Sequence, residues 1–195
     1  MKDQAQWNAC LHEALQAHER DRVFSFTYNN DIYFVKKHEK NHRRRIRWGG
    51  SHGYEHEAGH MKQVNEATGL APKVVLDTED FFVTLGGGFS LNELVSAEKK
   101  HQLETLVDVD LEHIFNRVGE ALGRLHEAGF THGRPVLRDI VYNPKSDSVQ
   151  FLDWENEYSI NWLDQKRLDV LLFVHGYFRE RKCRNILHKM LPCKV

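Results

Sequence analysis

Two aspartates in the second half of the chain, Asp139 and Asp153, are the side chains best placed to do chemistry. Asp139 comes directly before the apolar residues 140–142 and Asp153 directly after residues 149–152, with a Pro-Lys-Ser-Asp turn between the two segments. This pattern predicts two short strands whose ends bring the carboxylates together. Mg²⁺ prefers carboxylate oxygens, and phosphoryl transfer needs such ligands and fixed positive charge more than covalent chemistry. The pair is therefore a candidate magnesium site. The alternative without a function is a solvated loop and turn, where aspartate is common.

The elements that would position these residues follow from hydrophobic periodicity. Apolar residues at helical spacing predict helices over residues 3–19, 54–67 and 168–178 and a longer one through 111–125 that ends at Gly129. Strand-like segments predict a hairpin over residues 22–37 and strands at 73–76 and 81–85. Three glycines, residues 86–88, interrupt the pattern, and Ser90 is expected to cap a short helix after them. The order predicts an α+β protein with a β-containing half, residues 1–85, joined by a glycine hinge to a mainly helical half, residues 86–195.

The strongest sequence pattern is LGRLHEAGFTHGRPVLRDIVYN followed by VQFLDWE. It resembles the protein-kinase-like superfamily, especially small bacterial members that act on proteins, sugars or lipopolysaccharide core, and the resemblance runs from about Val23 to Phe178. In that family a helix ending in a Leu-His-x-x-Gly pattern enters the catalytic loop, and a metal-binding aspartate follows a short hairpin. His132 resembles the histidine that begins the loop, and Asp153 resembles the metal-binding aspartate. The resemblance implies a minimal bilobal kinase-like fold that uses ATP and Mg²⁺.

Upstream segments extend the resemblance. IYFVKK resembles the strand that carries the phosphate-binding lysine, which would be Lys36, while its neighbour Lys37 should point to the opposite face. YEHEAGHMKQV resembles the following helix, in which Glu57, or as second choice Glu55, would pair with Lys36. FFVTLGGGFSLNEL resembles the hinge between the lobes. The bland alternative for Lys36 and Glu57 is an exposed salt bridge, which contributes little.

The chain departs from the family pattern at two places. No glycine-rich loop precedes the Lys36 strand, because a predicted helix occupies that place. With His132 aligned to the family histidine, Arg134 stands where the general base aspartate belongs and Asp139 replaces a metal-binding asparagine. The alternative register makes Asp139 the base and Asn143 the metal ligand; we prefer the first because it lets residues 140–142 form the strand after the loop. An arginine cannot act as a base, so Arg134 would offer positive charge to a phosphate or an acidic substrate.

These features favour an ATP-dependent phosphotransferase that moves the γ-phosphoryl group to a hydroxyl of a protein or sugar acceptor. Lys36 would hold phosphates, Glu57 would orient Lys36, and the two aspartates of the candidate magnesium site would bind the cation. Because Arg134 replaces the base, a catalytically weak or dead pseudokinase that acts as a binding module is the alternative hypothesis. Asp164 or Asp169 is expected to support the catalytic loop from below.

A competing motif runs from His56 through Glu57 to His60 and has the H-E-x-x-H form of zinc peptidases. On a helix the two histidines share one face, and Glu57 is placed to activate a water molecule. In a chain with 13 histidines a chance match to this motif is not very surprising. A third ligand, which catalytic zinc usually has, is not evident, although His52 or Glu79 are candidates. Zinc hydrolysis is therefore the third hypothesis.

The composition of the 195 residues is that of an ordinary soluble protein, with 41% apolar and 28% charged residues and a formal net charge of −1. This near-neutral charge gives no global sign of a nucleic-acid or membrane partner. Residues 38–47 are strongly basic, which suits a solvated loop or a docking site for an anionic acceptor such as a saccharide. The three cysteines have neither metal nor disulfide spacing, and no stretch resembles a signal or a membrane span. We therefore predict a reduced, cytoplasmic protein.

Overall fold

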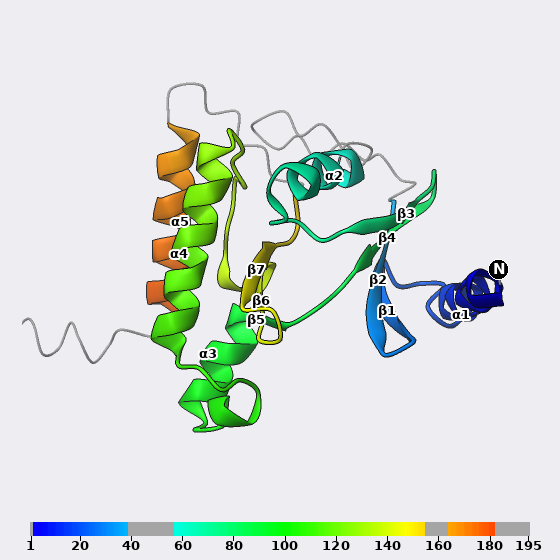
Figure 1. Ribbon diagram of the computed structural model, residues 1–195, viewed down its shortest axis with the longest axis horizontal. Helices are drawn as coiled ribbons and strands as arrows, with labels where there is room; N and C mark the ends of the chain where they lie inside the picture. The colour runs from blue at the N-terminus through cyan, green and yellow to red at the C-terminus, as the bar shows by residue number, and fades with distance from the viewer. Residues whose placement is uncertain (1, 39–56, 155–163, 182–195) are drawn as a thin grey trace, which may run out of the picture.

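The computed structural model describes residues 2–38, 57–154 and 164–181, which form an α+β protein with two antiparallel sheets (Figure 1). The elements follow in the order α1 (Lys2–Ala17), β1 (Val23–Tyr28), β2 (Asp31–Lys37), α2 (Glu57–Thr68), β3 (Val74–Asp77), β4 (Phe81–Leu85), β5 (Phe89–Ser90), α3 (Leu91–Lys99), η1 (Leu103–Thr105), α4 (Leu111–Glu127), η2 (Leu137–Asp139), β6 (Ile140–Asn143), β7 (Ser148–Phe151) and α5 (Gln165–Arg181). None of the helices in these described ranges is long and apolar enough to cross a membrane.

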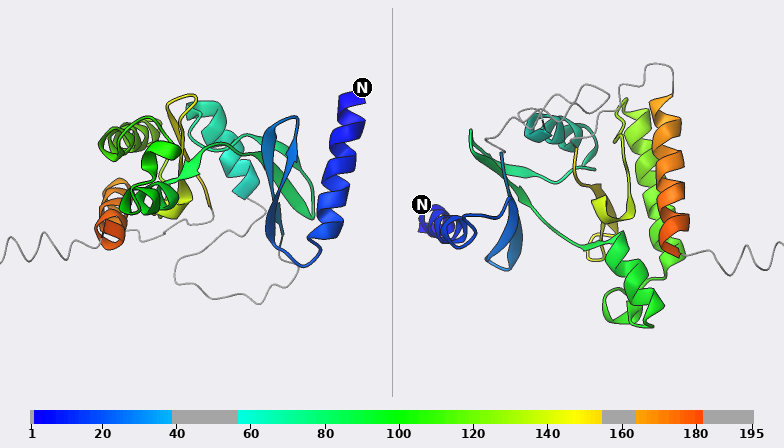
Figure 2. Two further views of the ribbon diagram at one scale, coloured as in Figure 1. Left: turned by 90° about the horizontal axis from the view of Figure 1, so that it is seen from below. Right: turned by 180° about the vertical axis from the view of Figure 1, so that it is seen from behind.

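The first sheet has the strand order β1-β2-β4-β3, and each neighbouring pair is antiparallel. Asn29 and Asn30 make the tight β1–β2 turn with φ values of 50° and 69°, a conformation that asparagine tolerates better than most residues. Helix α1 covers one face of this sheet, where a small core is formed by Leu11, Phe24, Val35 and Val83. Figures 1 and 2 place α1 beside the β1–β2 hairpin, at the end of the molecule opposite α4 and α5.

The second sheet, β5-β6-β7, packs with helices α3, α4 and α5 (Figure 1). Helix α4 begins at the cap Asp110, whose carboxylate accepts from the backbone N of His113 at 2.8 Å. The buried stripe of α4 consists of residues at helical spacing: Leu111, Ile114, Val118, Ala121, Leu122 and Leu125. This stripe lies in the larger core with Leu137, Ile140, Tyr142, Val149 and Phe151. The core therefore fixes the β6–β7 hairpin against α4.

Two connections join the sheets. The first is the glycine segment after β4, where Gly88 has a φ of 98° and a Cβ on it would lie 2.2 Å from the carbonyl oxygen of Tyr142. Only glycine fits such a close approach. The second is α2, whose Met61 and Val64 belong to the larger core and whose following residue Leu70 accepts from the backbone N of Phe151 at 2.7 Å. Helix α2 therefore ties the first sheet to the end of β7.

The predicted helices and strands are all found within the described residues, with ends shifted by a few residues. The glycine break and the Ser90 cap are confirmed as well: Ser90 and Glu93 form a full capping box at the start of α3. The short strand β5 and the two 3₁₀ turns were not predicted, because two or three residues carry no periodicity. The predicted basic loop, and residues 54–56 of the predicted second helix, lie outside the described residues.

Candidate functional site

A partly buried lysine joins the first sheet to the end of the second. Lys36 is on β2, and its Nζ donates to Glu57 Oε1 at 2.9 Å and to Asp153 Oδ1 at 3.2 Å. Glu57 is the first residue of α2 and its side chain is only 2% exposed. Asp153 lies two residues beyond β7 and has a φ of 62°, a left-handed conformation that is uncommon for a residue other than glycine. The structure thus brings three of the predicted site residues together from positions more than 100 residues apart.

Strand alternation explains why Lys36 reaches this cluster and Lys37 does not. Lys37 points to the other face of the sheet, as predicted, where its Nζ donates to the backbone carbonyls of His18 and Glu19 at the end of α1. The chain ahead of β2 contains no glycine, and α1 with β1 occupies the place of a glycine-rich loop.

Arg134 and Asp139 complete the cluster from the loop before β6. Arg134 Nη2 is 3.2 Å from Asp153 Oδ2 and 3.6 Å from Asp139 Oδ2, so one guanidinium nitrogen lies next to both carboxylates. Arg138 Nε donates to Asp139 Oδ1 at 3.1 Å from the solvent side. Among the described residues, the buried atoms Asp139 Oδ2 and Arg134 Nε have no hydrogen-bond partner. Such atoms are costly in a folded protein and often mark a binding site.

The pKa of Asp139 is raised from its usual range, first of all because burial removes water from the carboxylate. The negative charge of Asp153 raises it further, whereas Arg138 and Arg134 lower it. Asp139 therefore binds a proton more readily than an exposed aspartate does.

Asp169 anchors the loop that carries Arg134. It is completely buried in α5, and its carboxylate accepts from the backbone N of His132 at 2.8 Å and from that of Gly133 at 2.7 Å. His126 Nε2 lies 3.0 Å from the same carboxylate. Of the two aspartates expected to support the loop, Asp169 makes these contacts, whereas Asp164 accepts from the backbone at the start of α5.

His132 acts as a second fixed point of the loop. Its Nε2 donates to the carbonyl of Leu152 at 2.7 Å, and its Nδ1 accepts from the backbone N of Arg134 at 3.3 Å. The ring is therefore neutral, with its proton on Nε2. Burial lowers the pKa of His132, more than the nearby carboxylates raise it. His132 positions the residue before Asp153 and does not itself point its polar atoms into the cluster.

The hairpin register separates Asn143 from the cluster. In the ladder Ile140 pairs with Phe151, beside Asp139 and Asp153, whereas Asn143 pairs with Ser148 at the turn. Three residues of strand rise place Asn143 about 10 Å from Ile140. Its side-chain oxygen accepts from the backbone N of Lys145 in that turn. The alternative register, with Asn143 as a metal ligand, is thus hard to reconcile with the ladder.

The zinc motif is only partly described. His56 lies outside the described residues, as do Glu55 and His52. Glu57 contacts Lys36, and the ring of His60 packs near Phe130 and Trp154, with centroids 6.0 and 5.4 Å away. Within the described ranges no group of three or more His, Cys, Asp or Glu side chains is arranged to hold a metal ion.

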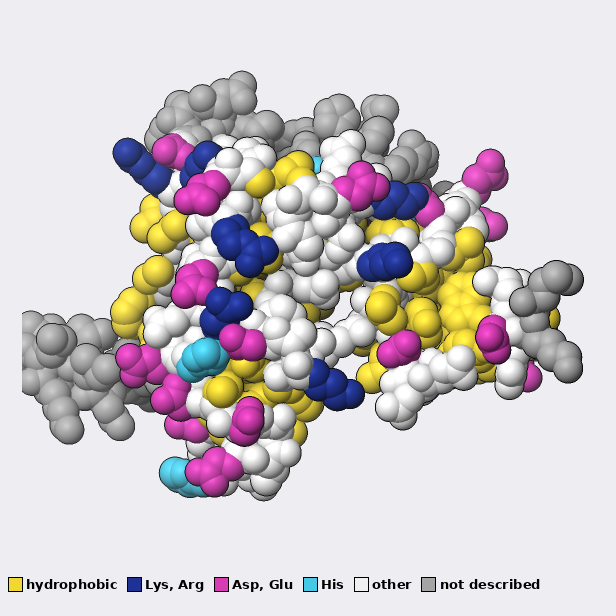
Figure 3. All heavy atoms as spheres, viewed as in Figure 1, with side chains coloured by type: hydrophobic (Ala, Val, Ile, Leu, Met, Phe, Trp, Pro, Cys, Tyr) yellow, Lys and Arg dark blue, Asp and Glu magenta, His cyan; other side chains and the backbone are white. Residues whose placement is uncertain are grey.

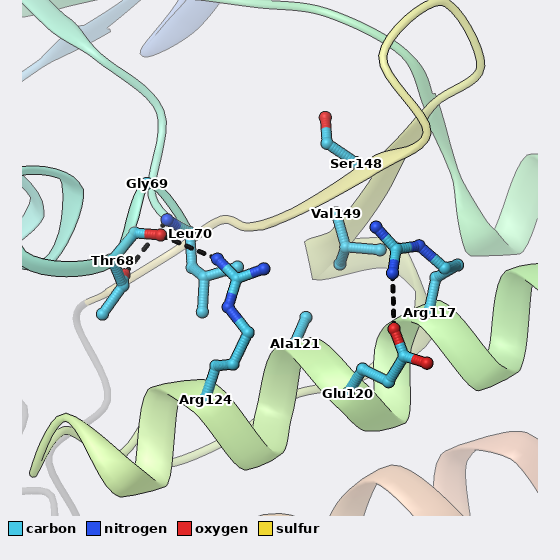
Figure 4. Close-up of a pocket in the computed structure, with 9 residues that line it drawn as sticks. All are labelled: Thr68, Gly69, Leu70, Arg117, Glu120, Ala121, Arg124, Ser148 and Val149. Carbon is cyan, nitrogen blue, oxygen red and sulfur yellow. Dashed lines mark hydrogen bonds and ion pairs between the residues drawn. The ribbon is translucent and has the colours of Figure 1, made fainter.

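Two shallow hollows lie away from the acidic cluster. One, of about 170 Å³, lies between the end of α2, α4 and β7 (Figure 4), where Arg124 donates to the carbonyl of Thr68 at 3.0 Å and Arg117 pairs with Glu120. The other, of about 180 Å³, lies at Gly86, Gly87 and the turn end of the β6–β7 hairpin. Arg124 of the first hollow ties α4 to the end of α2, and Arg117 ties α4 to Asp147 in the β6–β7 turn, so we assign this hollow a structural role.

Two residues of the site and its support were not predicted from the sequence, Arg138 and His126. Arg138 precedes Asp139 directly, so adjacency was an available signal. His126 is one helical turn before the loop, and only the contact with Asp169, 43 residues later, gives it a role.

Comparisons with known proteins give two distant likenesses. No family model matches the chain. Over 174 residues it is 25% identical to a protein of Haemophilus influenzae described as an uncharacterized protein, covering 84% of this chain and 65% of that protein. Over 116 residues it is 28% identical to a probable bifunctional tRNA threonylcarbamoyladenosine biosynthesis protein of Methanosphaera stadtmanae, covering 55% of this chain and 21% of that protein. The chain thus spans just under two thirds of the first relative and about a fifth of the second, and neither likeness assigns it to a family.

Proposed function

We propose that the protein is an ATP-dependent phosphotransferase with a minimal bilobal protein-kinase-like fold. The lobes would be the first sheet with α1 and α2, up to Leu85, and the second sheet with α3, α4 and α5. The reaction would move the γ-phosphoryl group of ATP to a hydroxyl of a protein or an anionic saccharide. A cytoplasmic location remains a prediction.

The observation that carries this proposal is the double contact of Lys36 with Glu57 and Asp153. An exposed salt bridge would be uninformative, but Glu57 is almost fully buried, and burying charges is expensive unless they are paired. A lysine held by one buried carboxylate while touching a second is pre-positioned to meet phosphate oxygens. This arrangement favours the phosphate-binding role over a surface ion pair and over zinc hydrolysis, in which Glu57 would have to face water.

An apolar surface next to Lys36 supports a nucleotide as the ligand. Ile32 and Phe34 lie on the same face of β2 as Lys36 by strand alternation, and the Phe34 side chain is 43% exposed. A Cβ on Gly86 would lie 2.3 Å from the Phe34 ring, so a glycine is needed where the chain leaves β4. Figure 3 shows hydrophobic side chains gathered over the β1–β2 hairpin. A flat base can pack on such a surface with its phosphates directed toward Lys36.

Asp139 and Asp153 fit the chemistry of Mg²⁺. Both supply carboxylate oxygens, one of which, Asp139 Oδ2, is buried without a hydrogen-bond partner among the described residues. Both also approach the same nitrogen of Arg134, so their oxygens converge on one point. When bound there, Mg²⁺ would neutralise charge on the phosphates.

In the transfer step the acceptor oxygen forms a bond to the γ-phosphorus while the bond to the ADP oxygen breaks. The acceptor hydroxyl passes its proton to the transferred phosphoryl group, because Arg134 in the place of the base cannot take it, and Asp139 would help to orient the hydroxyl. Lys36 and Arg134 supply positive charge to the phosphate oxygens, which is the larger part of catalysis in phosphoryl transfer.

The second candidate function is a pseudokinase that binds nucleotide without turnover. The position of Arg134 favours it, because a guanidinium next to Asp139 and Asp153 cannot remove a proton from an acceptor. Both functions require the same ligand, so they differ only in turnover.

The test is ATP binding and phosphate transfer by the purified protein with Mg²⁺, alone and with cell extract as the source of acceptor. Asp153→Asn removes a carboxylate from the cluster, and Asp147→Asn is the matched control in the turn of the same hairpin. We expect ATP to raise the melting temperature of the wild type, by an amount that grows with the logarithm of ligand concentration over Kd. We also expect extract-dependent transfer that Asp153→Asn abolishes and Asp147→Asn retains.

Binding without transfer would favour the pseudokinase. Absence of both would overturn the proposal. An anionic acceptor would dock at the basic residues 38–47, most of which lie outside the described residues. Neutralising Arg43, Arg44 and Arg45 should then raise the acceptor KM and leave ATP binding intact.

A further inference from the structure

Arg134 occupies the point on which Asp139 and Asp153 converge. Its Nη2 is 3.2 Å from one carboxylate and 3.6 Å from the other, and these are the oxygens a divalent cation would need. Within the described part of the chain, the cluster contacts join three cationic side chains to three carboxylates, and the formal charges of these six groups cancel (Lys36, Arg134, Arg138; Glu57, Asp139, Asp153). A cation that approached these two carboxylates without another ligand would meet Arg134 as a like charge at close range.

We call the contact of Arg134 with both Asp139 and Asp153 the carboxylate bridge. In this arrangement two polar atoms have no hydrogen-bond partner among the described residues. These are Arg134 Nε and Asp139 Oδ2, and both are buried. Each such atom costs free energy. A phosphate oxygen would satisfy the donor, and a divalent cation would satisfy the acceptor. Phosphate and cation together would therefore satisfy both buried atoms, whereas either ligand alone would satisfy only one of them.

We infer that Arg134 is an internal counter-ion. In the protein without ligand it pairs with Asp139 and Asp153, and when a nucleotide binds, its guanidinium moves from these carboxylates to the phosphates. Divalent cation and nucleotide then bind cooperatively. The phosphates draw the positive charge of Arg134 away from the cation site, and the cation replaces that charge beside the two carboxylates. The loop backbone stays in place during this exchange, since Asp169 accepts from His132 N and Gly133 N. Only the Arg134 side chain has to change rotamer. The nucleotide in this inference rests on the proposed function, whereas the bridge between the carboxylates does not.

The first experiment measures Mn²⁺ binding without nucleotide, from the electron paramagnetic resonance signal of the free ion. Arg134→Gln removes the bridging charge. Arg138→Gln is the matched control, because Arg138 touches only Asp139 among the three carboxylates and its side chain is 64% exposed. We expect Arg134→Gln to bind Mn²⁺ at least about tenfold more tightly than the wild type and Arg138→Gln to change affinity less than about threefold.

Adding Asp153→Asn to Arg134→Gln should remove the gain. Arg134→Lys keeps the positive charge and should keep Mn²⁺ binding weak, which gives a second variant should Arg134→Gln unfold. Equal Mn²⁺ affinity in the wild type and Arg134→Gln would overturn the inference. An equal gain in Arg138→Gln would also overturn it, because net charge alone would then explain the effect.

The second experiment repeats the titration with a non-hydrolysable ATP analogue. We expect the analogue to tighten Mn²⁺ binding in the wild type and to do so much less in Arg134→Gln. If no variant binds the analogue but Arg134→Gln still gains Mn²⁺, the proposed function fails and the carboxylate bridge stands. If the analogue binds with metal but its effect is the same in both proteins, the inference fails and the proposed function stands.

Discussion

Asp169 and Asp139 are both buried aspartates that fix the loop of residues 132–139, and they differ in how their oxygens are used. Asp169 holds the start of the loop from α5, and Asp139 is the last residue of the loop. Asp169 accepts from two backbone N–H groups with both of its oxygens, and His126 lies against one of them. Asp139 has one oxygen paired with Arg138, while the other has no hydrogen-bond partner in the described structure. A carboxylate whose bonds are all made stabilises the fold, and one with an unused buried oxygen is free to bind. The start of the loop is thus held by a carboxylate with both oxygens bonded, and its last residue keeps one buried oxygen without a hydrogen-bond partner among the described residues.

The largest effect should come from Asp169→Asn. The amide would turn an NH₂ group toward the backbone N–H of His132 or Gly133, leaving a buried donor without an acceptor. We expect the free energy of unfolding to fall by about 3 kcal/mol. For a chain of this size that lowers the melting temperature by about 6–12 °C, measured by thermal unfolding. Asp164→Asn, at the exposed start of α5, is the control and should change stability by less than about 0.5 kcal/mol.

Asp139→Asn should have a smaller effect of the opposite sign. Because burial raises the pKa of Asp139, the folded state favours the protonated carboxyl. The wild type therefore loses stability as pH rises through the folded-state pKa, and the variant, which cannot ionise, does not. At neutral pH we expect Asp139→Asn to be at least as stable as the wild type, with the difference vanishing in acid.

Urea unfolding of Asp139→Asn at several pH values checks this expectation. A variant that is clearly less stable at neutral pH would mean that the Arg134 and Arg138 contacts outweigh burial. The contrast between Asp139 and Asp169 would then disappear. Nucleotide and metal binding should be lost in Asp139→Asn in either case.

The sequence predicted the elements well and the site in part, for physical reasons that differ between residues. Helix α4 and the β6–β7 hairpin follow from local periodicity, so Asp139 and Asp153 were predictable as neighbours. The Lys36–Glu57 pair came from the family resemblance, since nothing local relates two residues 21 positions apart. The bridge made by Arg134 was not predictable, because it depends on a rotamer within a loop whose position is set by Asp169.

The smallest effect concerns His132, whose backbone N donates to Asp169 and whose ring donates to the carbonyl of Leu152. Burial lowers its pKa below the ordinary value, so the unfolded chain binds a proton that the folded chain does not. Stability is therefore retained above the unfolded-state pKa of about 6.5 and is lost as pH falls below it. His132→Gln keeps a donor for the carbonyl of Leu152 but cannot titrate, so we expect a flatter decline of stability below pH of about 6.5. Urea midpoints across that range measure the slope, which a constant loss of stability does not alter. If the slope of stability against pH were the same in His132→Gln and the wild type, His132 would take up a proton in the folded state as it does in the unfolded state. The assignment of a neutral ring between Leu152 and Arg134 would then be wrong.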